Sequence, residues 1–223
     1  MSPVSTVLLD ALGTLVELQA PAPRLRARLA EAGFEVSEER AAAGIRAEVA
    51  YYLAHHLEGS DRESLEDLRN RCATAMMKAL DLDGLDHETA RRALLGALEF
   101  RPYEDAIPAL RELRAKGHGL VVVSNWDCAL PDWLGQSGLL ELVDGVVTSA
   151  EVGAAKPDAR VFRRALELAG VEAGEAVHVG DSPDTDVEGA RSAGIRAVLV
   201  QRDGEPPPGV ESIRSLGELA PLL

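Results

Sequence analysis

Five short apolar runs, separated by stretches with helical spacing, constrain the fold of this chain more than any other feature of its sequence. The runs are residues 5–10, "GLVVVSN" ending at Asn125, "DGVVTS" ending at Ser149, "AVHVGD" ending at Asp181 and "AVLV" ending at Val200. Continuous apolar runs of this length are typical of strands buried on both faces of a parallel sheet. Helical patterns lie between them, as in "DARVFRRALELAG", which Asp158 can cap and Gly170 can end. The alternation predicts an α/β fold in which helices flank a parallel sheet.

Residues 16–100 interrupt this alternation. No convincing strand appears there, and four segments space their apolar residues as helices do. They are "PAPRLRARLAEAG", "SEERAAAGIRAEVAYYLAHHLEG", "SLEDLRNRCATAMMKAL" and "HETARRALLGALEF". The chain has 223 residues, more than the usual single domain of roughly 100–200. We therefore predict a core domain made of residues 1–15 and 101–223, with residues 16–100 inserted as a helical domain.

The charge balance argues against several classes of partner. The chain carries 37 acidic and 23 basic residues, which gives a net charge of −14. Acidic residues interrupt every basic stretch, so the sequence predicts no binding of nucleic acid or of an anionic membrane surface. An anionic small substrate would need a local positive site, because the overall field repels it.

Cysteine use and hydropathy favour a cytoplasmic protein. Cys72 and Cys128 lie on different predicted elements, without the spacing of metal ligands, and no secretory signal precedes the first strand. No apolar run approaches the ~20 residues needed to span a bilayer. We expect a monomer or homodimer that acts on a small molecule.

The residues that end the predicted strands form the candidate site, because open α/β sheets bind ligands beyond the carboxyl ends of their strands. Asp10, Ser124 with Asn125, and Asp181 end three of the strands, and Lys156 lies in a loop before a helix. An aspartate can be a covalent nucleophile, and two facing carboxylates need a cation or proton between them. We predict Mg²⁺ between Asp10 and Asp181, with Ser124, Asn125 and Lys156 binding a phosphorylated substrate.

Four motifs in this order resemble those of the haloacid dehalogenase superfamily of hydrolases. They are "DALGTL", "VVVSNWD", "AAKPD" and "HVGDSPDTD", and each lies at a predicted strand end or loop. The resemblance covers the whole sheet domain, and the interval after the first motif fits a helical cap. It implies a Rossmann-like core with an inserted cap domain, a Mg²⁺ cofactor and an aspartyl-phosphate mechanism. The Trp126-Asp127 pair further resembles the branch called rhythmically-expressed-gene-2-like.

The resemblance also implies roles for individual residues. It makes Asp10 the nucleophile, places Ser124 and Lys156 on the phosphate, and places the metal on Asp10, Asp181, Asp186 and the backbone carbonyl of Leu12. Leu12 departs from the family's phosphatases, which usually carry there a second aspartate that protonates the leaving alkoxide and later deprotonates water. Losing this acid should cost about 10²–10⁴ in rate for a poor leaving group, and much less where the leaving group needs no proton.

Leu12 keeps two alternatives open. The 2-haloacid dehalogenases of the superfamily also lack the second aspartate and need no metal, but they typically replace the acids of the fourth motif, which this chain retains. Arg46 and Tyr52 resemble an arginine and a tyrosine of a dehalogenase cap, a pair that helices of this composition also offer by accident. The other alternative is a binding or regulatory protein on a disabled phosphatase scaffold.

Other polar residues near the motifs receive structural interpretations. His178 lies inside an apolar strand and is interpreted as a core histidine. Asp184 is expected either to cap the helix that begins near Asp186 or to contact a metal ligand. Asp127 is the first candidate to supply the proton that Leu12 cannot.

Overall fold

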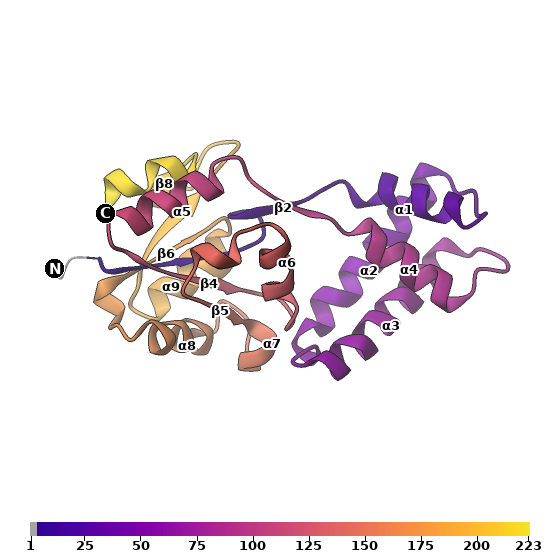
Figure 1. The fold of residues 1–223 in the computed structure, drawn as a ribbon, viewed down its shortest axis with the longest axis horizontal. Helices are drawn as coiled ribbons and strands as arrows, with labels where there is room; N and C mark the ends of the chain where they lie inside the picture. Colours follow the sequence, from indigo (N-terminus) through magenta and orange to yellow (C-terminus); the bar gives the residue numbers. More distant parts are fainter. Residues whose placement is uncertain (1–3) are drawn as a thin grey trace. The chain divides into compact units, whose positions relative to one another are not determined.

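The computed structural model describes residues 4–223, which fold into two compact units. The first unit runs to Glu17 and resumes at Arg101, and the second comprises Leu18–Phe100. The chain therefore leaves the first unit once and returns to it once (Figure 1).

A six-stranded sheet forms the first unit, in the order β5-β4-β1-β6-β7-β8, and every neighbouring pair is parallel. The strands are β1 (Thr6–Leu9), β4 (Gly119–Ser124), β5 (Gly145–Thr148), β6 (Ala176–Gly180), β7 (Arg196–Val200) and β8 (Ser212–Ile213). Thr6 of β1 lies opposite Gly119 on one side and Ala176 on the other, so β1 is central. All four of its residues are buried, as a strand covered on both faces requires. The predicted Rossmann-like α/β fold is confirmed.

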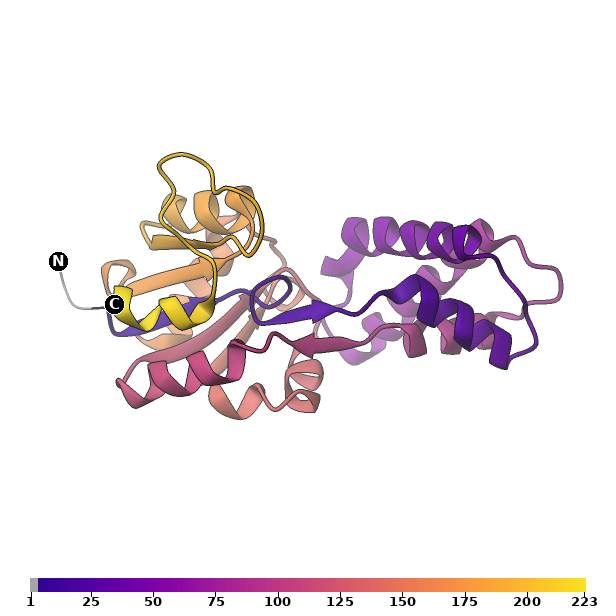
Figure 2. The ribbon, with the colours of Figure 1, turned by 90° about the horizontal axis from the view of Figure 1, so that it is seen from above.

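Helices lie on both faces of this sheet (Figure 1, Figure 2). On one face α5 packs against β4 and the C-terminal turns, and on the other α8 and α9 pack together. The helices of this unit are α5 (Ala106–Ala115), α6 (Leu130–Gln136), α7 (Ser149–Val152), α8 (Ala159–Ala169) and α9 (Gly189–Ser192), with a π-helical segment at Pro183–Glu188. Leu8 of β1 shares a buried cluster with Val161 and Phe162 of α8. This cluster fixes α8 over the centre of the sheet.

The ends of α8 follow from local sequence. The Asp158 carboxylate accepts the backbone N–H of Arg160 at 2.9 Å, and Gly170 ends the helix with a φ of 67°. Glycine adopts this left-handed conformation without the steric cost that a Cβ brings. Both ends are those that the sequence predicts.

The second unit consists of helices α1 (Pro21–Glu31), α2 (Glu38–His55), α3 (Arg62–Leu80) and α4 (His87–Ala97). Side chains of Ser37, Asp61 and Asp86 cap the last three of these by accepting backbone N–H groups of the first turn. The helical insertion that the sequence predicts is confirmed. Among the described residues, none of the helices combines the length and the apolarity needed to cross a membrane.

Short strands appear where none was predicted. β2 (Val16–Leu18) and β3 (Phe100–Pro102) pair in a two-stranded sheet, and they are the two segments that connect the units. The expectation of no strand within residues 16–100 was therefore wrong at both ends of that range. Strands of three residues are too short to show a period of two, so only their pairing defines them.

Glu48 is a buried acid in the interface between α2 and α3. The residue is only 6% exposed, and its side chain accepts a hydrogen bond from the Cys72 thiol. Burial raises the pKa of Glu48 from 4.5 to about 7, although the bond from Cys72 acts in the opposite direction. The folded protein therefore holds this proton at pH values where the unfolded chain has lost it.

This proton makes stability depend on pH. The full contribution is present below 4.5, where both states are protonated, and is lost as pH rises through about 7. Since one pKa unit is worth about 1.4 kcal/mol, Glu48→Gln should raise the free energy of unfolding by about 3 kcal/mol at roughly pH 8 and change it little at roughly pH 4. Chemical denaturation followed by circular dichroism across this range checks the prediction. Glu39→Gln, at an exposed position of the same helix, is the control, and an equal response of both variants would contradict it.

Candidate active site

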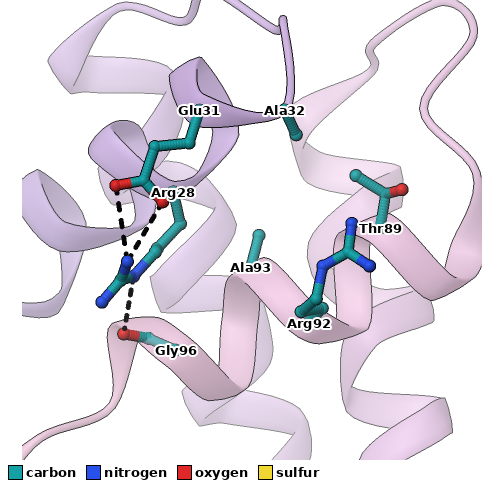
Figure 3. Close-up of a pocket in the computed structure, with 7 residues that line it drawn as sticks. All are labelled: Arg28, Glu31, Ala32, Thr89, Arg92, Ala93 and Gly96. Carbon is teal, nitrogen blue, oxygen red and sulfur yellow. Dashed lines mark hydrogen bonds and ion pairs between the residues drawn. The ribbon is translucent and has the colours of Figure 1, made fainter.

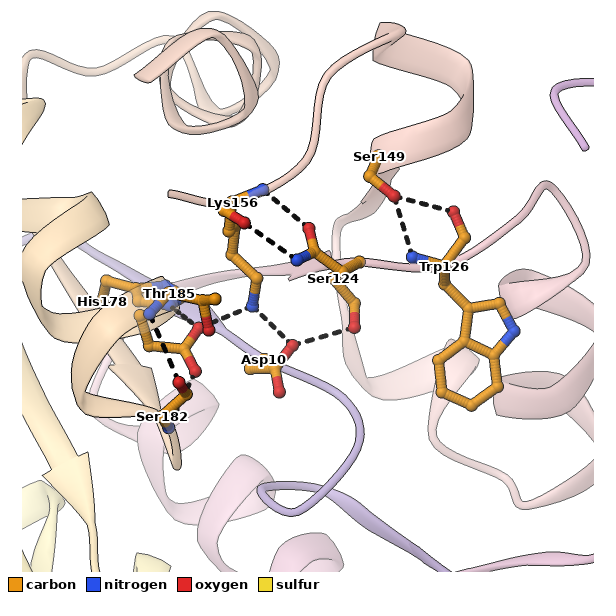
Figure 4. A network of polar contacts seen from close by, with 10 residues as sticks. Asp10, Ser124, Trp126, Ser149, Lys156, His178, Ser182 and Thr185 are labelled. Atoms are coloured by element: carbon orange, nitrogen blue, oxygen red, sulfur yellow. Dashed lines mark hydrogen bonds and ion pairs between the residues drawn. The ribbon is translucent and has the colours of Figure 1, made fainter. Parts of the chain in front are cut away.

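The predicted site residues meet at the carboxyl edge of the sheet, and Figure 4 shows Asp10, Ser124 and Lys156 among them. Asp10 follows β1, Ser124 ends β4 and Asp181 follows β6, and these three strands are neighbours in the sheet. Lys156 reaches the same edge from the loop before α8. The strand order therefore gathers residues that are up to 171 positions apart in the chain, counted from Asp10 to Asp181.

Asp10 is held by two donors. The Ser124 hydroxyl donates to its Oδ1 at 2.8 Å, and the Lys156 ammonium donates to the same oxygen at 2.6 Å. All three side chains are buried. Neither donor reaches Oδ2, so this oxygen is the one that the two contacts leave for a substrate or a metal ion.

Lys156 bridges two carboxylates. Its Nζ also donates to Oδ1 of Asp186 at 2.6 Å. Its backbone is fixed by Asn125, whose amide oxygen accepts the Lys156 N–H at 2.7 Å and whose amide nitrogen donates to the Lys156 carbonyl at 3.1 Å. Asn125 thus orients the lysine in this structure, and its predicted contact with substrate stays a prediction.

The charges in this cluster depend on one another. Burial lowers the pKa of the Lys156 ammonium, but the charges of Asp10 and Asp186 oppose burial more strongly in sum, and the pKa is raised. Lys156 is therefore a cation at neutral pH. For Asp10, burial raises the pKa and Lys156 offsets only part of this effect, because the charge of Asp186 adds to it.

Asp186 differs from Asp10 although both contact the same ammonium. Burial favours its neutral form, yet the charge of Lys156 and a hydrogen bond with His178 hold its pKa well below the usual range. His178 Nε2 lies 2.9 Å from Oδ1, and the backbone N–H of Ser182 donates to Oδ2 at 3.0 Å. Asp186 is therefore a carboxylate with donors on both oxygens, so Asp10 and Asp181 have more lone pairs free for a metal ion.

Asp181 is more exposed than the other two acids. Partial burial of its carboxyl, together with the charges of Asp10 and Asp186, raises its pKa to about 6. Gly13 packs directly against it: a Cβ at this glycine would lie 2.1 Å from Oδ2 of Asp181, and its φ of +83° also disfavours other residues. The loop after β1 can approach Asp181 only because residue 13 has no side chain.

The acids form a site whose chemistry fits Mg²⁺. Carboxylate oxygens of Asp10, Asp181 and Asp186 all lie within 4.8 Å of one another. Mg²⁺ prefers oxygen ligands and uses one or two carboxylates beside water and substrate phosphate. A cation there would also relieve the repulsion that raises the pKa of Asp181. Leu12 lies in the adjoining loop and is 43% exposed, and metal binding by its carbonyl stays a prediction.

The structure confirms that His178 is a core histidine, since it is fully buried in β6, but it also shows a contact with Asp186 that the sequence analysis missed. The period of two in a strand could have predicted this contact, because it places His178 and Gly180 on the same face. That face meets Asp186, since a Cβ at Gly180 would lie 2.2 Å from Cγ of Asp186. The expectation for Asp184 requires a correction. Asp184 does not cap the following helix, because the Ser182 hydroxyl accepts the N–H of Thr185 there.

Ser149 is a further residue that sequence analysis missed. Its hydroxyl accepts the backbone N–H of Trp126 at 3.0 Å and donates to the Trp126 carbonyl at 3.1 Å (Figure 4). The loop that follows Ser124 is thereby fastened to the end of β5. Asp127 lies in the same loop, where its Oδ1 accepts the N–H of Ala129 at 2.8 Å. Its role as a proton donor stays a prediction.

The helical unit has a groove of its own, between α1 and α4 (Figure 3). Arg28 pairs with Glu31 of the same helix at 3.0 Å, and it also donates across the groove to the carbonyl of Gly96. The groove of about 290 Å³ contains none of the residues that the sequence assigns to the site. Two arginines line the groove, Arg28, which is paired with Glu31, and Arg92, and we assign the groove no role.

The site has an aspartate directly after the central strand of a parallel sheet. A serine, a lysine and two further acids lie beside this aspartate, and the arrangement is that of a family of hydrolases. The model of the haloacid dehalogenase-like hydrolases matches residues 4–194, and the chain belongs to this family. The narrower resemblance to the rhythmically-expressed-gene-2-like branch stays a prediction, because the names of the similar proteins do not specify it.

Curated relatives and a solved structure agree with the family. The chain is 41% identical over 127 residues to haloacid dehalogenase-like hydrolase domain-containing protein 3 of Bos taurus, covering 54% of this chain and 51% of that protein. It is 44% identical over 108 residues to a phosphoserine phosphatase of Thermus thermophilus, covering 47% and 42%. The matches thus span about half the length of these relatives or less. A crystal structure of a HAD phosphatase from Thermococcus onnurineus has 30% identity and a TM-score of 0.65, covering 98% of this chain and 97% of that one.

Proposed function

We propose that the protein is a Mg²⁺-dependent phosphatase that hydrolyses a small phosphorylated metabolite through an aspartyl-phosphate intermediate. The observation that carries the proposal is the cluster of Asp10, Asp181 and Asp186 around one point, with Ser124 and Lys156 bonded to Asp10. Relatives named as phosphatases support the same reaction class. We further propose a cytoplasmic monomer or homodimer, without nucleic acid or membrane partners.

Asp10 is the proposed nucleophile. An oxygen of its carboxylate attacks phosphorus, the P–O ester bond breaks, and the electron pair leaves with the substrate oxygen. Water then attacks the phosphorus of the aspartyl phosphate, the P–O bond to Asp10 breaks, and inorganic phosphate leaves as the Asp10 carboxylate is restored. Over the two steps the water loses one proton and the leaving substrate oxygen gains one. Lys156 and Ser124 would bind phosphoryl oxygens throughout, the first as a buried positive charge and the second as a short hydrogen-bond donor.

Metal binding is proposed for Asp10, Asp181, Asp186 and the Leu12 carbonyl. Mg²⁺ supplies Lewis-acid polarisation of phosphoryl oxygens and neutralises charge on the transferring group. Without such a cation, an anionic substrate would meet the three acids of the cluster together with the Lys156 ammonium, which already pairs with two of them. The retention of Asp181 and Asp186 therefore favours phosphate transfer over a metal-free reaction.

A chelator experiment tests the proposal. Phosphorylated metabolites and aryl phosphates would be assayed with Mg²⁺ and with chelator, alongside 2-haloacids under both conditions. Phosphate release that requires Mg²⁺ supports the proposed function. Halide release that is equal with Mg²⁺ and with chelator would contradict the proposed function and support the dehalogenase alternative, which Leu12 favours. No turnover of any substrate would favour the binding or regulatory alternative.

The metal assignment makes a prediction for Asp181→Asn. Loss of even an indirect partner of a metal costs about 10–100-fold in affinity, so loss of a direct ligand should weaken Mg²⁺ binding at least that much. Titration calorimetry measures this effect, and Asp83→Asn is the matched control, because it removes the same charge from an exposed position of the helical unit. Equal Mg²⁺ affinity in Asp181→Asn and the parent protein would sink the assignment.

A further inference from the structure

Arg202 follows β7 and contacts the loop that comes after β1. Its Nη2 donates to the Thr14 carbonyl at 2.8 Å, and its Nε lies 3.5 Å from the carbonyl of Gly13. These residues are 188 and 189 positions apart in the chain. The guanidinium therefore forms hydrogen bonds with the backbone of a loop that is distant from it in sequence.

The guanidinium is itself held rigidly. Asp105 accepts two of its N–H groups, at 2.9 and 3.1 Å, and the Tyr103 ring lies 3.7 Å from Cζ. Asp105 is anchored in turn by the Ser215 hydroxyl and the Leu216 N–H, both at 2.9 Å. A forked ion pair of this kind fixes an arginine more firmly than a single contact does.

The loop that Arg202 contacts also packs against the acid cluster. Gly13 packs on the carboxylate of Asp181, and its N–H bonds the Val16 carbonyl at 2.8 Å. Leu12, whose carbonyl is a proposed metal ligand, comes immediately before Gly13. The hydrogen bonds from Arg202 to the Gly13 and Thr14 carbonyls therefore help to fix the position of this loop relative to Asp181.

We propose that Arg202 is a positioning residue that holds the Leu12–Thr14 loop against Asp181 and so keeps the metal site formed. The metal part of this inference rests on the proposed function. The loop part does not, because it concerns bonds within the protein. Arg202 touches neither the substrate nor the metal in this scheme, and it acts only through the loop.

Amide hydrogen exchange tests the loop part without any metal. In Arg202→Met the N–H groups of Gly13 and Leu15 should exchange about 10–100-fold faster, as expected when charge-assisted bonds that close a loop are lost. Arg196→Met is the matched control: this arginine makes a similar forked pair with Glu211, but at the opposite end of β7. Unchanged protection of the loop in Arg202→Met, or equal loosening in both variants, would overturn the inference.

Mg²⁺ titration tests the metal part. Arg202→Met should weaken binding by about tenfold or more, Arg202→Lys should recover part of it, and Arg196→Met should match the parent protein. If the parent itself binds no Mg²⁺, the proposed function fails, and the exchange experiment still decides the loop part. Should Arg202→Met fail to fold, Asp105→Asn replaces it, because that change loosens the guanidinium and keeps its charge. Loop protection and Mg²⁺ affinity unchanged in that variant would also overturn the inference.

Discussion

Asp10→Asn should remove phosphatase activity, with kcat reduced on the order of 10⁴-fold or more, as for loss of other covalent nucleophiles. Asparagine has the same size and can still accept the bonds from Ser124 and Lys156, so the fold of the site should persist. What it lacks is a carboxylate that can attack phosphorus. The measurement is turnover of an aryl phosphate at saturating Mg²⁺, for freshly purified variant and parent.

Binding of beryllofluoride, which mimics an acyl phosphate, is the companion measurement. The parent should bind it in the presence of Mg²⁺ and Asp10→Asn should not, even where circular dichroism shows both to be folded. Ser124→Ala separates the roles: it removes a donor to Asp10 but leaves the nucleophile, so it should retain measurable turnover. If Asp10→Asn kept a tenth or more of the parent activity, the nucleophile would have to be another residue.

Leu12→Asp should raise hydrolysis of alkyl phosphates by up to about 10²-fold and change hydrolysis of nitrophenyl phosphate much less. A nitrophenolate leaves with little protonation, whereas an alkoxide needs a proton in the transition state. Leu12 is 43% exposed, so an aspartate there can be accommodated, and the backbone carbonyl stays in place. The measurement is kcat/KM for both substrate types in both proteins.

Leu12→Asn is the matched control for this prediction. It has the size and polarity of the aspartate but cannot transfer a proton, so it should not favour alkyl phosphates. Both variants would first be checked for folding and Mg²⁺ binding, since an added charge can repel the substrate. An equal effect of Leu12→Asp on the two substrate types would show that another residue supplies the proton, with Asp127 the first to test.

Much of the fold follows from local sequence. The five buried runs became β1, β4, β5, β6 and β7, because a strand covered on both faces must be apolar throughout. Likewise, Asp158 and Gly170 determine the ends of α8 through contacts within a few residues. Strands β2, β3 and β8 were missed, because two or three residues carry no periodic signal and exist as strands only through their partners.

The sequence also named the acids, the serine and the lysine that the structure brings together, because residues at strand ends share one edge of a parallel sheet. Their pairing was a different matter. The order β4-β1-β6 decides that Lys156 bridges Asp10 and Asp186, and no local pattern encodes that order. The contact of His178 with Asp186 and the contact of Arg202 with Thr14 have the same origin. Local sequence thus determined which residues the site contains, whereas long-range packing decided which of them touch, because hydrogen bonds form between neighbours in space rather than in sequence.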